Sequence, residues 1–164
     1  MRISAKTDYA LRALLELASS PDVLVSSEQL SINQQIQHKF LEAIMAELRR
    51  IDLVESQRGT GGGHRLRSAA DQITLADVIR AINGPLVHIR GECPQDLHYT
   101  DGVQNLQLIW VAMRAALRST LETVTLQDIV DGEIPDHIRA LTESAEAWES
   151  HGFTVDREKP QAKK

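Results

Sequence analysis

The stretch HKFLEAIMAELRRIDLVESQRGTGGGHRLR, residues 38–67, decides the fold of this chain. Its first part repeats apolar residues at helical spacing and predicts an amphipathic helix over about 37–50. The apolar side of this helix consists of Phe40, Ile44 and Leu48, with Leu41 and Met45 adjoining. The opposite side consists of Lys39, Glu42, Ala43, Ala46 and Arg50.

The second part of the stretch predicts a β-hairpin. Residues 53–57 alternate as a strand does, residues 59–63 are a glycine-rich turn, and residues 64–67 form the return strand. The run is not a nucleotide-binding loop, because no Gly-Lys-Ser or Gly-Lys-Thr follows it and His64 breaks the dinucleotide fingerprint. A plain turn and a wing that lets Arg58 approach DNA are the two remaining interpretations.

Helices are predicted on both sides of this stretch. Ser4 can cap a helix over 5–19, Ser26 a short helix that ends near Asn33, and Thr74 a helix through Ile82. Three helices followed by a hairpin are typical of a winged helix-turn-helix. We therefore predict a mainly α fold in which residues 1–85 are a winged helix-turn-helix DNA-binding domain.

The C-terminal half predicts a second helical region. Residues 86–103 have no sustained period and are interpreted as an effector or sensor-like loop. A stripe about 24 Å long follows at helical spacing and consists of Leu106, Ile109, Trp110, Met113, Leu117 and Leu121. One small domain cannot cover this stripe, so residues 104–156 are predicted to be a helical dimerisation region. Its last amphipathic helix would carry Ile138, Leu141, Ala145 and Trp148, before a disordered tail at 157–164.

Composition limits the function. The 164 residues carry a net charge of -5, but residues 1–70 have nine Lys or Arg against eight Asp or Glu, and residues 71–164 have nine against fifteen. The longest run without a charge has 12 residues, whereas a membrane helix needs about 20 apolar ones. The single cysteine and the lack of a signal peptide predict a cytoplasmic protein that does not bind membranes. No catalytic constellation is recognisable, so an enzyme is not expected.

The segments HKFLEAIMAELRRIDLVESQRGTGGGHRLR, ITLADVIRAINGP and MRISAKTDYALRALLELA resemble the winged-helix regulator family typified by IscR, NsrR and CymR. The resemblance is close over residues 1–85 and looser over 104–132. It implies a homodimeric, sequence-specific regulator of transcription that binds a palindromic operator in double-stranded DNA. Two positions depart from the family pattern: His64 replaces a usual Tyr, and Asp52 replaces a usual Gly.

The resemblance also implies which residues contact DNA. The set consists of Gln37, His38, Lys39, Glu42, Arg58, Gly59, Thr60, Gly61 and Arg65. Glu42 can accept a hydrogen bond from cytosine, Gln37 can bond adenine, and Arg58 suits a narrow minor groove. The alternative for Glu42 is a solvated helix face.

Cluster-binding members of the family carry three cysteines in the loop before the long helix. This chain has Cys93 alone, followed by His98 and Tyr99, so we expect no metal and no cofactor. The alternative is a 2Fe-2S cluster held by Cys93, His98 and Asp8. The function that we expect is a repressor of sulfur or cysteine metabolism. The alternatives are an iron-sulfur or redox-sensing regulator and an adaptor that binds a metabolic enzyme or a small effector.

Overall fold

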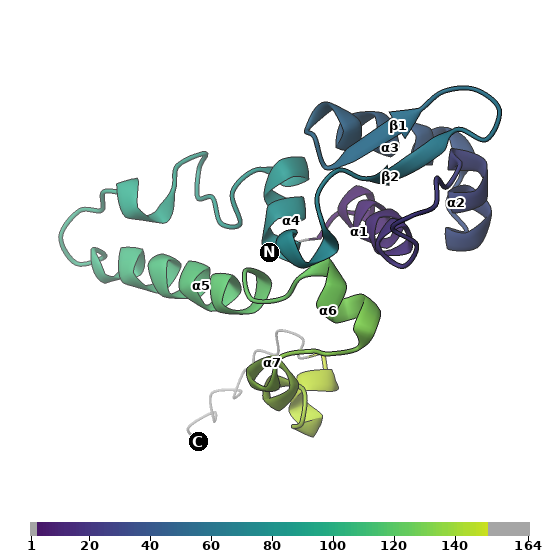
Figure 1. Ribbon diagram of the computed structural model, residues 1–164. Coiled ribbons are helices and arrows are strands. Elements are labelled where there is room, and N and C mark those ends of the chain that lie inside the picture. Colours follow the sequence, from purple (N-terminus) through teal and green to yellow (C-terminus); the bar gives the residue numbers. More distant parts are fainter. Residues whose placement is uncertain (1–2, 151–164) are drawn as a thin grey trace, which may run out of the picture.

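A winged helix-turn-helix forms the N-terminal part of the chain, as the sequence predicted. The computed structural model describes residues 3–150. Helices α1 (Ala5–Ala18), α2 (Ser27–Gln34) and α3 (His38–Arg50) are followed by strands β1 (Val54–Gln57) and β2 (Gly63–Leu66), which pair as an antiparallel hairpin (Figure 1). The predicted mainly α fold class is confirmed.

The core of this unit lies where α3 packs on α1 and α2. Buried side chains of the three helices meet there and include Ala10, Leu14, Leu17, Leu30, Leu41, Ile44, Met45 and Leu48. Phe40 departs from the prediction, because its side chain remains 40% exposed and contacts the Tyr9 ring edge-on, with ring centroids 5.7 Å apart. The buried stripe of α3 is therefore narrower than the sequence pattern suggested.

Local capping fixes where these helices begin and turn. The Ser4 and Ser26 hydroxyls each accept a hydrogen bond from a backbone N–H at 3.1 Å, which confirms both predicted N-caps. Gln35 ends α2 in the left-handed conformation with φ of 54°, and the next residue, Ile36, is buried. This tight turn connects α2 directly to α3.

Two further helices complete the N-terminal core from later in the chain. After the short 3₁₀ helix η1 (Ala70–Gln72), α4 (Leu75–Asn83) and α6 (Leu126–Asp131) each begin with a capping box. Backbone hydrogen bonds join their starts, from Leu75 N to Val124 O at 3.0 Å and from Leu126 N to Ile73 O at 2.9 Å. The Leu126 side chain is 0% exposed and belongs to the same core as α1.

From α4 the chain runs outward through the 3₁₀ helix η2 (Pro94–Asp96), and helix α5 (Asn105–Leu121) then returns alongside this segment toward the winged unit (Figure 1). One side of α5 is covered by its own chain: Leu117 and Leu121 pack on α4, and Trp110 Nε1 donates to the Tyr99 hydroxyl at 3.0 Å. Large apolar side chains elsewhere on the helix remain exposed, namely Leu106, Leu108, Ile109 and Met113, and the surface that they form is called the uncovered side of α5.

The chain ends differently from the prediction. A single amphipathic helix was expected through Ile138 and Trp148, but α7 (Asp136–Leu141) stops there and a 3₁₀ helix, η3 (Ala145–Trp148), follows. The Ser144 hydroxyl accepts the N–H of Ala147 and starts η3 separately, so that prediction is wrong. The predicted tail at 157–164 lies outside the described residues. No helix in residues 3–150 has the length and apolar character that crossing a bilayer requires.

Candidate nucleic-acid interface

The outward face of α3 carries the residues expected to read DNA. Gln37 is the N-cap residue, and it, His38, Lys39 and Glu42 are all exposed at the start of the helix. Ala43 and Ala46 are the next exposed positions, and their small side chains do not protrude from the helix. A helix with polar groups at its N-terminal end and small residues behind them can enter the major groove.

Charges on this face are only partly paired. His38 Nδ1 lies 3.7 Å from Glu42 Oε2, so a protonated His38 would compete for the carboxylate. Lys39 has no ion-pair partner among residues 3–150 and remains available to an external anion. Glu42 thus lies on a solvated helix face with His38 as a specific neighbour one helical turn away.

The glycine-rich tip of the hairpin is set by space and backbone conformation. Gly61 has φ of 77°, in the left-handed region, and the Gly62 N–H donates to the Gly59 carbonyl at 2.9 Å. A Cβ atom at Gly62 would lie 2.3 Å from the Gln57 carbonyl oxygen. The tip is therefore a compact turn that leaves Arg58 and Thr60 exposed at its edge.

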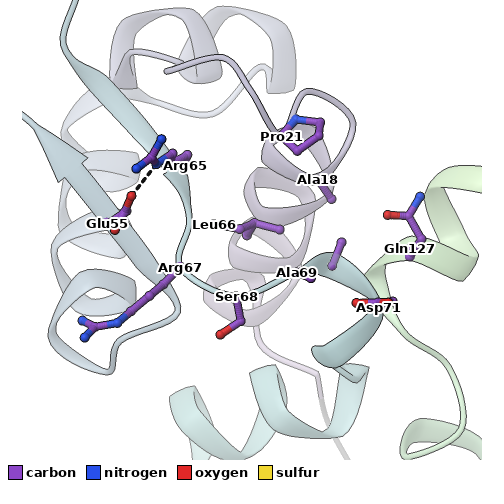
Figure 2. A pocket seen from close by; sticks show the side chains of 11 residues that line it. Ala18, Pro21, Glu55, Arg65, Leu66, Arg67, Ser68, Ala69, Asp71 and Gln127 are labelled. Atoms are coloured by element: carbon purple, nitrogen blue, oxygen red, sulfur yellow. Dashed lines mark hydrogen bonds and ion pairs between the residues drawn. The ribbon is translucent and has the colours of Figure 1, made fainter.

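The base of the hairpin neutralises two of its three arginines. Arg65 stands opposite Glu55 in the strand register and forms an ion pair with it, which Figure 2 shows beside a cavity of about 550 Å³. Arg67 forms an ion pair with Asp52. Arg58 is the wing arginine that has no acidic partner within the described part of the chain. The expected wing residues are thus brought together, but Arg58 and Arg65 differ in available charge.

His64 connects the hairpin to the helix-turn-helix, a role that the sequence did not predict. Its Nε2 lies 2.8 Å from the Ser27 hydroxyl of α2 and its Nδ1 lies 2.8 Å from the Ser56 hydroxyl of β1. Backbone bonds between His64 and Val25 reinforce this contact. Burial lowers the pKa of His64 below its usual value, and the positive charge of Arg49 lowers the pKa further.

Asp52 explains how the chain turns from α3 into the hairpin. Its φ is 62°, in the left-handed region where glycine is favoured and Asp is tolerated better than most residues. The carboxylate also accepts the guanidinium of Arg67. Asp52 therefore adopts the backbone conformation that a glycine would adopt in this turn, and it adds an ion pair with Arg67.

The residues of the alternative metal site are not assembled. Asp8 lies on α1 and pairs with Arg12 at 3.7 Å, whereas Cys93 and His98 lie on the loop before α5. Among residues 3–150, no three His, Cys, Asp or Glu side chains come together as metal ligands. The donor set does not fit an iron-sulfur cluster, because one thiolate per chain is too few.

Comparisons with known proteins agree with this geometry. The Rrf2 family model, described as an iron-dependent transcriptional regulator, matches residues 3–132. The Mycobacterium tuberculosis protein Rv1287 is 40% identical over 155 residues, covering 93% of this chain and 96% of that protein. The Bacillus subtilis transcriptional regulator CymR is 31% identical over 137 residues, covering 81% and 94%. The solved structure of this CymR, titled the global cysteine regulator, has a TM-score of 0.69 at 28% identity, covering 80% of this chain and 98% of that one.

The lowered pKa of His64 predicts a pH dependence of stability. As the pH falls below about 6.5, the unfolded chain binds a proton at this position before the folded chain does, so the free energy of unfolding should fall. Urea unfolding at several values between about pH 7.5 and 5.5 should show a shallower loss for His64→Gln than for the wild type. His88→Gln, at an exposed position, is the control and should keep the wild-type slope. Equal slopes for all three proteins would contradict the assignment.

Proposed function

The chain belongs to the Rrf2 family of transcriptional regulators, and from this premise we propose that it is a homodimeric repressor that reads a palindromic operator. The family and its homologues are regulators and not enzymes. The observation that supports sequence-specific binding best is the exposed start of α3 beside a wing with a free arginine.

Readout is divided between α3 and the wing in this proposal. Gln37, Lys39 and Glu42 face base edges in the major groove, where a carboxylate selects cytosine by accepting from its amino group. Arg58 enters the adjacent minor groove, where the negative potential of narrow segments attracts guanidinium groups. Gly59, Thr60 and Gly61 bring the wing backbone close to phosphate. Arg65 contributes less than Arg58, because Glu55 already neutralises it.

Homodimer formation is supported by the uncovered side of α5. Ile109 is 60% exposed and Leu108 is 64% exposed in the single chain, although both are large apolar residues. A helix that extends beyond its own domain with such a side is typical of a subunit interface. Of the expected interface residues, Trp110, Leu117 and Leu121 are half-buried within the single chain, and Leu106, Ile109 and Met113, which are exposed, would form the contact. Two recognition helices would then address half-sites about 34 Å apart or a multiple of it.

Cysteine or sulfur metabolism is the regulated pathway that we propose. The support is the similarity to CymR, whose structure is titled as a global cysteine regulator. We also propose that operator binding needs no iron-sulfur cluster, although the family model carries an iron-dependent description. The reason is the ligand set, because Cys93 has no second cysteine in the chain.

Replacing the wing and helix residues should change binding in different ways. Arg58→Ala should weaken binding to all sequences and reduce the slope of log affinity against log salt by about one unit. Glu42→Ala should keep that slope and lose about 1–3 kcal/mol of discrimination at one base pair. Arg65→Ala is the matched control within the wing and should reduce the slope less than Arg58→Ala. Titration of operator and scrambled DNA at several salt concentrations measures all three. Unchanged preference and slope in both Arg58→Ala and Glu42→Ala would reject the interface.

Charges on the uncovered side of α5 should separate the subunits. Ile109→Glu combined with Met113→Glu is expected to give monomers that bind the operator poorly, because one half-site alone remains in contact. Sedimentation equilibrium and operator titration measure the two effects. Ser119→Glu, at an exposed polar position of the same helix, is the control and should remain dimeric. Dimers with unchanged operator affinity in the double variant would show that this side of α5 is not the interface.

Cys93→Ser should retain operator affinity within a few-fold of the wild type, because no cluster depends on this thiol in our proposal. Protein purified without oxygen should show no visible charge-transfer absorption and no stoichiometric iron and sulfide. A coloured protein that loses both its colour and its operator affinity on this substitution would overturn the proposal and identify Cys93, with His98 or Asp8, as ligands.

A further inference from the structure

A cavity separate from the DNA-reading surface lies where α5 meets the winged unit. It has a volume of about 290 Å³ and is formed by α4, α5 and the intervening segment. Its lining residues are Arg80, Pro85, Leu86, Gln95, Arg114 and Arg118. Half of the lining is arginine and none of it is acidic.

Two of these arginines share one carboxylate. Arg80 of α4 and Arg118 of α5 both donate to Glu122, which accepts the Arg118 Nε–H at 2.9 and 3.0 Å with its two oxygens. The hydrogen bond from Arg80 is the main cause that lowers the pKa of Glu122, and Arg118 lowers it further. A single negative charge thus balances two guanidinium groups.

Arg114 has a neutral partner instead. Its Nη1 donates to the side-chain oxygen of Gln95, and the Gln95 amide nitrogen donates in turn to Asp96 at 2.9 Å. Gln107 fixes this segment by donating to the Pro94 and Gln95 carbonyl oxygens at 3.2 and 3.1 Å. The cavity therefore has three oriented guanidinium groups, with Glu122 as the carboxylate that contacts two of them directly.

This arrangement is unfavourable without an anion. Arg114 and Arg118 lie four residues apart on one face of α5, a spacing at which like charges destabilise a helix. Three guanidinium groups against Glu122 and the nearby Asp96, which contacts Gln95 rather than an arginine, leave an excess of one positive charge around the cavity. Guanidinium groups bind carboxylate and phosphate oxygens in a bidentate manner, so an oxyanion with several charged oxygens would match both the sign of this charge and the three donors.

We propose that this cavity binds a small dianionic oxyanion compound, such as a phosphate, a sulfate or a dicarboxylate, and that the ligand joins α4 to α5. The volume suits a small molecule rather than a nucleic-acid strand. Arg80 comes from the DNA-binding unit and Arg114 and Arg118 from the helix that returns to it, so a ligand held by all three fixes the angle between the two parts. This regulatory consequence rests on the proposed function, because that angle sets the separation of the recognition helices in a dimer.

Thermal unfolding of the full-length protein tests binding without DNA. Inorganic phosphate, sulfate and succinate are titrated separately at constant ionic strength, with sodium chloride as the compensating salt. We expect at least one dianion to raise the melting temperature saturably, and the comparison among the three separates inorganic from dicarboxylate ligands. Arg114→Gln should need about tenfold or more of the same anion for an equal shift, and Arg114→Lys should recover part of the response.

The control is Arg139→Gln, which removes one positive charge from exposed α7 and should respond as the wild type does. Equal shifts in Arg114→Gln and wild type, or no saturable shift with any of the three anions, would overturn the site. Operator titration with and without the active anion then tests the coupling. The coupling is supported if the anion changes the operator affinity of the wild type and not that of Arg114→Gln. It is overturned if the wild type binds the operator equally well with and without the anion. Failure of the wild type to bind any operator would reject the proposed function while leaving the anion result intact.

Discussion

The packing of α3 against α1 fixes how the proposed DNA-facing surface is presented. α3 has 13 residues, and Leu41, Ile44 and Leu48 must leave water together, each side chain contributing about 1.5–3 kcal/mol when buried. This requirement fixes the rotation of the helix about its own axis. Lys39 and Glu42 then point outward, Glu42 with the exposed His38 beside it at 3.7 Å, so the proposed interface is a consequence of core packing.

The wing depends on the same packing through a few polar contacts. Asp52 reverses the chain at the end of α3, and the His64 imidazole connects β1 to α2. Both residues differ from those usual in the resembling family, yet each meets a local requirement, a left-handed backbone in one case and a bridge between hydroxyl groups in the other. The position of Arg58 relative to α3 is therefore determined by side chains that do not touch DNA in our proposal.

Much of this architecture could be predicted from short-range patterns, and the exceptions have physical causes. The helix starts at Ser26 and Thr74 could be predicted, because a capping hydrogen bond joins residues only three positions apart in the sequence. Which apolar residues of α5 are covered by the chain itself could not be predicted. Leu106, which is exposed, and Trp110, which is half-buried, share one helical period, and this period is the same whether the residues pack on their own chain or on another. The pairing of Arg65 with Glu55 needs the strand register, and the three arginines of the cavity are 34 to 38 residues apart between α4 and α5. No local sequence signal carries such information.

Burial of Leu126 in the N-terminal core has a consequence for biosynthesis. The ribosome releases the chain from its N-terminus, so the residues of α5 emerge before the DNA-binding unit can close its core with α6. The uncovered side of α5 is then exposed while the unit beneath it is still incomplete. In the proposed dimer, the α5 surface would therefore be available to a partner before the winged unit has completed its own core.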